Sequence, residues 1–256
     1  MAYLLLTLGV LIPSFVLSID KYFVNLHLWG HHPAWYPWIH TYVMFGQRGP
    51  ATLLFLPFFL WTAWRRRSTE PLVILVTALI LLNLSVGVVK YAVGRIGPLH
   101  TEAVHLIFAG GNIYPSGHVS NTVVLYGLMA WIAPKFRRTA IALTAILSVT
   151  VGMGTIYLRT HWVSDVVGGW LAGALVLVAL PTFLPIAQRW TDQAIESLRT
   201  RRLHRRGPVR GRHVAGAVAS ARPAVVAPVG PAHRSTSTPP VARTTSAAQR
   251  KATPVS

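Results

Sequence analysis

Long apolar stretches, separated by short polar connections, dominate the chain up to about residue 187. A helix that crosses a bilayer needs about 20 mainly apolar residues, and six stretches approach that length. Gly, Pro, Ser and Thr inside such stretches are tolerated better in lipid than in water. The pattern therefore predicts an all-α fold class, a polytopic membrane protein with a six-helix transmembrane bundle. The six stretches are residues 3–19, 50–64, 71–89, 119–133, 139–158 and 165–187.

The basic residues of the short connections predict the orientation of this bundle. Three Arg residues, 65–67, follow the second stretch, Lys135 and two Arg residues follow the fourth, and an Arg-rich tail follows the sixth. Because Lys and Arg concentrate in cytoplasmic loops, we expect all of these on the cytoplasmic side, together with both termini. Residues 20–49, 90–118 and 159–164 then face outward.

Two segments outside the apolar stretches complete the domain prediction. Residues 20–49 are rich in Trp, Tyr and His, and aromatic rings favour the headgroup region, so we expect an outer interfacial segment there. From about Thr200 the chain changes to Arg, Ala, Pro, Ser and Thr, a composition typical of disorder. We therefore predict a transmembrane domain over residues 1–188 and a basic, mostly disordered cytoplasmic tail over residues 189–256.

Composition agrees with a membrane protein and limits the chemistry. Charged residues make up 12% of the chain and the mean hydropathy is +0.47, whereas soluble domains carry about 25% charged residues. More than half of the 24 Lys and Arg residues lie in 189–256, so this tail either sets the topology as a solvated segment or binds anionic lipid headgroups. Its few aromatic residues argue against a nucleic acid partner. The absence of cysteine excludes disulfides, thiolate metal sites and Cys nucleophiles.

Three polar clusters lie on the predicted outer side. Lys90 ends the third stretch, Pro115-Ser116-Gly117-His118 precedes the fourth, and His161 and Asp165 precede the sixth. Each has an ordinary structural explanation, respectively a snorkelling Lys, a helix N-cap and a structural His–Asp hydrogen bond. Together they supply a cation, backbone N–H groups at a helix start, a proton donor and a His whose second nitrogen is free to attack phosphorus. Phosphoryl transfer without a metal or other cofactor needs these groups.

These clusters resemble the motifs K-x6-R-P, P-S-G-H and S-R-x5-H-x3-D of the type 2 phosphatidic acid phosphatase family, which includes vanadium-dependent haloperoxidases. The resemblance implies that His161 attacks phosphorus and forms a phosphohistidine, Asp165 orients His161, and His118 protonates the leaving oxygen. It also implies that Lys90, Ser116 and the backbone N–H of Gly117 hold the phosphoryl oxygens. The substrate would be a lipid phosphate of the phosphatidic acid, phosphatidylglycerol phosphate or polyprenyl diphosphate class, hydrolysed at the outer face of a bacterial cell membrane.

The sequence departs from the family pattern at both motif arginines. The first falls on Gly97 and the second on Thr155, while the Ser before it falls on Gly154. Losing a charge-assisted contact to the phosphoryl group costs several kcal/mol in a transition state, on the order of 3. We expect Arg159, four residues after Thr155 on a helical face, to reach the phosphate site, with Arg95 and the Thr155 hydroxyl as further candidates.

Two other functions stay open, and the missing arginines motivate the first of them. The chain could be a catalytically weak relative that binds lipid phosphates without turnover, or a phosphotransferase that passes the phosphoryl group to an alcohol. Haloperoxidase activity is disfavoured because those relatives are soluble. A metal site of His27, His31, His32 and His40 is also disfavoured, because Asp20 is the single carboxylate in that segment.

Overall fold

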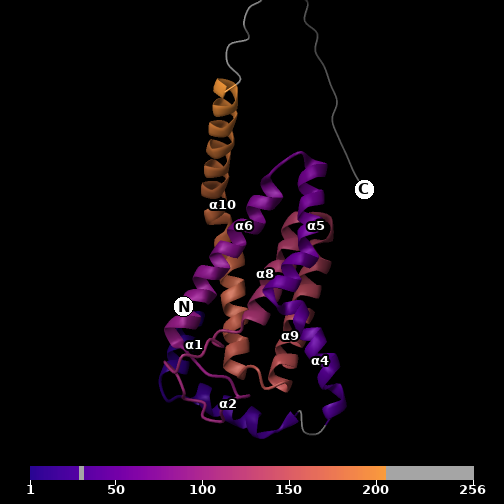
Figure 1. Ribbon diagram of the computed structural model, residues 1–256. Helices are drawn as coiled ribbons and strands as arrows, with labels where there is room; N and C mark the ends of the chain where they lie inside the picture. Colours follow the sequence, from indigo (N-terminus) through magenta and orange to yellow (C-terminus); the bar gives the residue numbers. More distant parts are fainter. Residues whose placement is uncertain (29–31, 206–256) are drawn as a thin grey trace, which may run out of the picture. The chain divides into compact units, whose positions relative to one another are not determined.

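The computed structural model describes residues 1–28 and 32–205, which Figure 1 shows as coloured ribbon. In these residues the chain forms helices joined by loops and contains no β-strand, which confirms the all-α prediction. The predicted disorder and lipid contacts of the tail fall mainly on residues 206–256, outside the described part of the chain.

The first predicted span is broken into two helices. α1 (Ala2–Leu11) and α2 (Phe15–Asn25) meet at an angle of 72°. Pro13 disfavours helical geometry at the residue before it, and the Ser14 side chain accepts a hydrogen bond from Val16 N, which starts a new helix. A helix of 10 residues is about 15 Å long, half of a hydrocarbon core, so α1 cannot cross a membrane alone.

Three helices are long and apolar enough to cross a membrane, and the number rises to five if each of two bent helix pairs forms one span. The prediction of six spans is therefore not confirmed for the described residues. Besides the break after α1, α8 (Gly117–Ile132) has 16 residues and is only about 24 Å long. The three long helices are Glu70–Val93, Pro134–Tyr157 and Val163–Arg202.

The Glu70–Val93 helix contains an irregular turn. Its regular parts are α6 (Glu70–Leu82) and α7 (Val88–Val93), and between them residues Asn83–Gly87 form one π-helical turn. At the end of α7, Gly94 has φ +56, a left-handed conformation that glycine adopts without a steric penalty. The chain leaves the helix there and enters a long loop that continues to α8.

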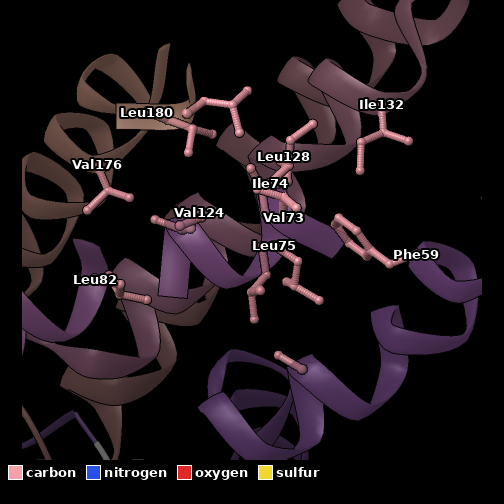
Figure 2. Close-up of a cluster of buried hydrophobic side chains, with 14 of the residues drawn as sticks. Phe59, Val73, Ile74, Leu75, Leu82, Val124, Leu128, Ile132, Val176 and Leu180 are labelled. Carbon is pink, nitrogen blue, oxygen red and sulfur yellow. The ribbon is translucent and has the colours of Figure 1, made fainter. Parts of the chain in front are cut away.

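α8 lies at the centre of the helical bundle. It packs against α5 (Arg48–Arg66), α6, α9 (Arg137–Tyr157) and α10 (Val163–Arg205). Ten of its residues are buried. Figure 2 shows the main hydrophobic core, where apolar side chains from α5, α6, α8 and α10 interlock. Because these four helices share one core, the ends of α8 and α10 are held in a fixed relation to each other.

The outer segment predicted over residues 20–49 is largely helical. It contains most of α2, a short 3-10 turn (Pro33–Trp35) and α4 (Tyr36–Val43), and α4 packs against α9. Trp35, Tyr36 and Trp38 remain exposed, as expected for rings at a membrane interface. The turn and α4 form the bent partner of α5, at 56°.

The last helix extends well beyond its predicted end. α10 continues to Arg205, although the predicted transmembrane domain ends at residue 188. The residues after 188 include good helix formers such as Gln, Ala, Glu and Leu, which continue a helix that is no longer apolar. The boundary placed by hydropathy therefore marks the end of the apolar stretch and not the end of the helix.

Candidate functional site

His161 is held in a loop between the end of α9 and the start of α10. Its side chain is 6% exposed, and its Nδ1 lies 3.4 Å from Oδ2 of Asp165, which is fully buried. The same oxygen accepts a hydrogen bond from Trp162 N at 2.9 Å. The carboxylate therefore orients the imidazole through Nδ1, which leaves Nε2 available, as expected from the spacing of the two residues.

The P-S-G-H segment is hydrogen-bonded directly to the turn that carries the carboxylate of Asp165. Ser116 N donates to the backbone oxygen of Asp165 at 2.8 Å. Ser116 is also the N-cap of α8, since its Oγ accepts from Val119 N. A Cβ added at Gly169 on α10 would lie 2.8 Å from Ser116 O, so only glycine permits this approach. The starts of α8 and α10 are thus locked together.

This arrangement brings the two histidines face to edge. The ring centroids of His118 and His161 are 5.8 Å apart, with an interplanar angle of 74°. Burial, and next the nearby His161 and Lys90, lower the pKa of His118 to about 4. An anion bound between these groups would counteract all three effects and favour the protonated imidazole.

Tyr114, two residues before the N-cap, anchors the segment on its other side. It is fully buried, its hydroxyl lies 2.9 Å from Thr7 Oγ1 of α1, and its ring contacts Gly168. Burial raises the pKa of Tyr114 to about 12, so the phenol stays protonated. It has a structural role in which α1 supports the loop before α8.

A pocket of about 360 Å³ opens between the two histidines and the end of α7. The predicted residues Lys90, Gly117, His118 and His161 line it together. Lys90 donates to the backbone oxygen of Asn112, and a Cβ added at Gly117 would lie 3.9 Å from Lys90 Nζ. The first N–H groups of α8 have no partner within the helix, and the lining position of Gly117 and His118 makes them available to an anion. Ser116, in contrast, is buried behind the lining.

Arg95 does not face this pocket. Its side chain is fully buried, with Nη1 at 2.9 Å from Asp165 Oδ1 and Nη2 at 2.7 Å from Asp20 Oδ2. Both ends of the guanidinium are therefore committed to carboxylates. The Ser164 hydroxyl and N–H bind Asp20 as well, which closes a buried network behind Asp165.

Arg159 and Thr155 are also directed elsewhere. Arg159 lies 3.4 Å from Glu102 and lines a smaller cavity of about 20 Å³ beside α2, which His161 also lines but Lys90 and His118 do not. Thr155 is fully buried and its hydroxyl donates to Gly152 O, one turn earlier on α9. α9 ends at Tyr157 and Arg159 has φ +55, so the helical face that would have aligned Arg159 with Thr155 does not continue.

Several residues that line or support the site were not identified from the sequence. Gln47, Arg48 and Asn121 line the pocket, and Asp20 supports Asp165 through Arg95. Asp20 is the single acidic residue before Glu70. Because an acidic residue within an apolar region is a functional candidate, Asp20 could have been identified from the sequence. Arg48 lies at the start of a predicted span on the outer side, but nothing in its spacing connects it with the motifs.

Comparison with known proteins finds a family and a relative that resemble this chain. Residues 71–189 match the PAP2 superfamily, so the chain carries a PAP2 superfamily domain. Phosphatidylglycerophosphatase B of Bacillus subtilis (strain 168) is 27% identical over 103 residues, which are 38% of this chain and 49% of that protein. The matched region thus spans about half the length of this curated relative.

A solved structure shares the fold. The crystal structure of the first transmembrane PAP2 type phosphatidylglycerolphosphate phosphatase from Bacillus subtilis superposes with a TM-score of 0.56 and 20% identity. The superposition covers 71% of this chain and 92% of the other. With its long apolar helices and this membrane relative in fold, the chain is an integral membrane protein.

Proposed function

We propose that this protein hydrolyses a phosphomonoester or diphosphate of a membrane lipid through a phosphohistidine at His161. The observation that carries the proposal is the meeting of His118, His161 and Lys90 at one pocket, with Asp165 behind His161. Phosphatidylglycerol phosphate is the first substrate to test, because the relatives in sequence and fold carry that activity in their names.

The reaction follows from the positions of the groups. Nε2 of His161 forms a bond to phosphorus while the bond from phosphorus to the lipid oxygen breaks. His118 donates its proton to that oxygen, and the charge of the bound phosphate keeps this imidazole protonated until then. Neutral His118 next accepts a proton from water, which attacks the phosphohistidine and frees phosphate and His161. Lys90 and the N–H groups of Gly117 and His118 stabilise the phosphoryl oxygens.

The purified protein in detergent is expected to release phosphate from phosphatidylglycerol phosphate, phosphatidic acid or a polyprenyl diphosphate, with a chelator present. His161→Ala, prepared in parallel, should release none. If the wild type binds these lipids but releases no phosphate, the chain is a lipid-phosphate-binding relative. If phosphate appears on an added alcohol in place of water, the chain is a phosphotransferase. Either result overturns the hydrolase proposal.

The pocket is proposed to face the outside of the membrane. Arg48, Lys90 and His161 lie at one end of the helices that carry or adjoin them. The Arg residues 65–67, Lys135 and the Arg residues 137–138 lie at the other ends of α5, α8 and α9. Short basic loops remain in the cytoplasm. This polarity supports an extracytoplasmic site and a cytoplasmic end of α10.

The lack of native cysteine makes this orientation directly measurable. His105→Cys, in the exposed loop before α8, is expected to react with a membrane-impermeant maleimide in intact cells. Thr69→Cys, exposed between α5 and α6, should react only after permeabilisation. The reverse labelling pattern would place the pocket on the cytoplasmic side.

A further inference from the structure

The two arginine positions of the family motifs cannot bring a guanidinium to the pocket in this chain. A Cβ added at Gly97 would lie 3.1 Å from Thr160 O, in the turn that carries His161. Thr155 is buried under the same turn, where its backbone oxygen accepts from Thr160 N at 3.0 Å. These positions serve to pack the loop closely. An arginine for the phosphoryl group must therefore come from another element.

Arg48 is the arginine that lines the pocket. It is the first residue of α5, and together with Gln47 it lines the pocket that His118 of α8 and His161 of the α9–α10 loop also line. Its Nη1 donates to Asn83 Oδ1, in the π-helical turn before α7. This bond fixes the side chain through one nitrogen and leaves Nη2 and Nε for a ligand.

The charges around the pocket favour a doubly charged anion. Lys90 and Arg48 line it together, and its lining contains no carboxylate. Neither cation forms an ion pair with a residue in 1–28 or 32–205. Two cations beside one cavity repel each other, and a phosphoryl group between them replaces that repulsion by two attractions.

A further polar group in the lining is unpartnered. Asn121, one turn after His118 on α8, is 4% exposed, and its Oδ1 has no hydrogen-bond partner among the described residues. A buried amide without a partner costs free energy that a polar ligand would recover. By a half-turn of its side chain, this amide can present its NH2 group to a phosphoryl oxygen.

We propose that Arg48 is the arginine that grips the phosphoryl group of the substrate and takes over the task of both motif arginines. The inference rests on the proposed function, since the ligand is the same lipid phosphate. Lys90 holds one side of the group, and the planar guanidinium of Arg48 holds the other through Nη2 and Nε. The arginine thus comes from a helix that lies before the PAP2-matched residues 71–189.

The test compares arginine variants of the full-length protein in detergent. Arg48→Ala is expected to lower kcat/KM for the lipid phosphate by about 10²- to 10³-fold. Arg48→Lys should recover only part of this loss, because an ammonium group cannot make the paired contacts of a guanidinium. Arg65→Ala, at the opposite end of the same helix, is the matched control and should retain wild-type kcat/KM.

Two results would overturn the inference while leaving the hydrolase proposal intact. One is an Arg48→Ala protein within threefold of the wild type under conditions in which His161→Ala is inactive. The other is a large loss in Arg159→Ala with none in Arg48→Ala, which would return the task to Arg159. If the wild type itself hydrolyses no lipid phosphate, the affinity for orthovanadate is measured in place of kcat/KM. Arg48→Ala should then weaken this affinity about tenfold or more. An unchanged affinity would refute the assignment of Arg48.

Discussion

His161→Ala is expected to lose phosphate release by about 10⁴-fold or more with every substrate, because it removes the nitrogen that is proposed to attack phosphorus. His118→Ala should behave differently. With a lipid phosphomonoester it should lose about 10²- to 10⁴-fold, since the alkoxide leaving group needs a proton. With an aryl phosphate of an acidic phenol the loss should be much smaller, because that leaving group departs without one.

The measurement is a pair of kcat/KM values, one for each substrate type, for the wild type and the two variants. His105→Ala serves as control, because this histidine is exposed in the loop before α8 and does not line the pocket. The assignment of roles fails if the aryl phosphate rescues His161→Ala, or if it leaves His118→Ala as impaired as the lipid does.

Arg95→Ala is expected to destabilise the protein by about 3–5 kcal/mol, because it leaves two buried carboxylates without their shared cation. Asp20 and Asp165 are both fully buried and both bind this guanidinium. Without Arg95, each of these two carboxylates carries the full free-energy penalty of burying an unpaired charge. The variant should also lose kcat, since Asp165 no longer has a fixed position behind His161.

Thermal unfolding in detergent, together with kcat at a temperature where the variant is folded, measures both effects. Arg159→Ala is the matched control. Its ion pair with Glu102 is 3.4 Å long and Glu102 is 67% exposed, so its loss should cost no more than about 1 kcal/mol. Equal unfolding temperatures for the two variants would mean that the Asp20–Arg95–Asp165 network adds nothing to stability.

The local geometry of the motif residues could be predicted from the sequence, because short motifs depend on neighbours in the chain. The four-residue spacing of His161 and Asp165 spans one helical turn, and the P-S-G-H segment contains its own N-cap. Both features depend on neighbours in the chain. The convergence of the three clusters was predicted from membrane topology together with the family motifs, and the structure brings Lys90, His118 and His161 to one pocket.

The supporting arginines could not be placed in this way, because their positions depend on loops and on contacts distant in sequence. The expectation for Arg159 assumed a helix that in fact ends at Tyr157. Arg95 lies in a loop and bonds Asp20, 75 residues away. Arg48 reaches Asn83 across 35 residues. No periodicity in the sequence connects such pairs.

Hydropathy likewise predicted the positions of the apolar stretches better than the limits of the helices. It merged α1 and α2 into one span, since Pro13 and Ser14 barely change the average over a window of that length. It also ended the last element near residue 187, although α10 continues to Arg205. Hydropathy measures compatibility with lipid, whereas helix limits depend on proline, capping and propensity.

The π-helical turn at Asn83–Gly87 determines the direction in which the side chains of the later residues in that helix point. Successive residues of a regular α-helix are turned by about 100° around the axis, so one residue accommodated in a wider turn rotates the later side chains by that amount. Lys90 lies three residues beyond this turn. In an uninterrupted helix its ammonium group would be turned by about 100° from its present direction, away from the pocket. The irregular turn thus directs the side chain of Lys90 towards the pocket.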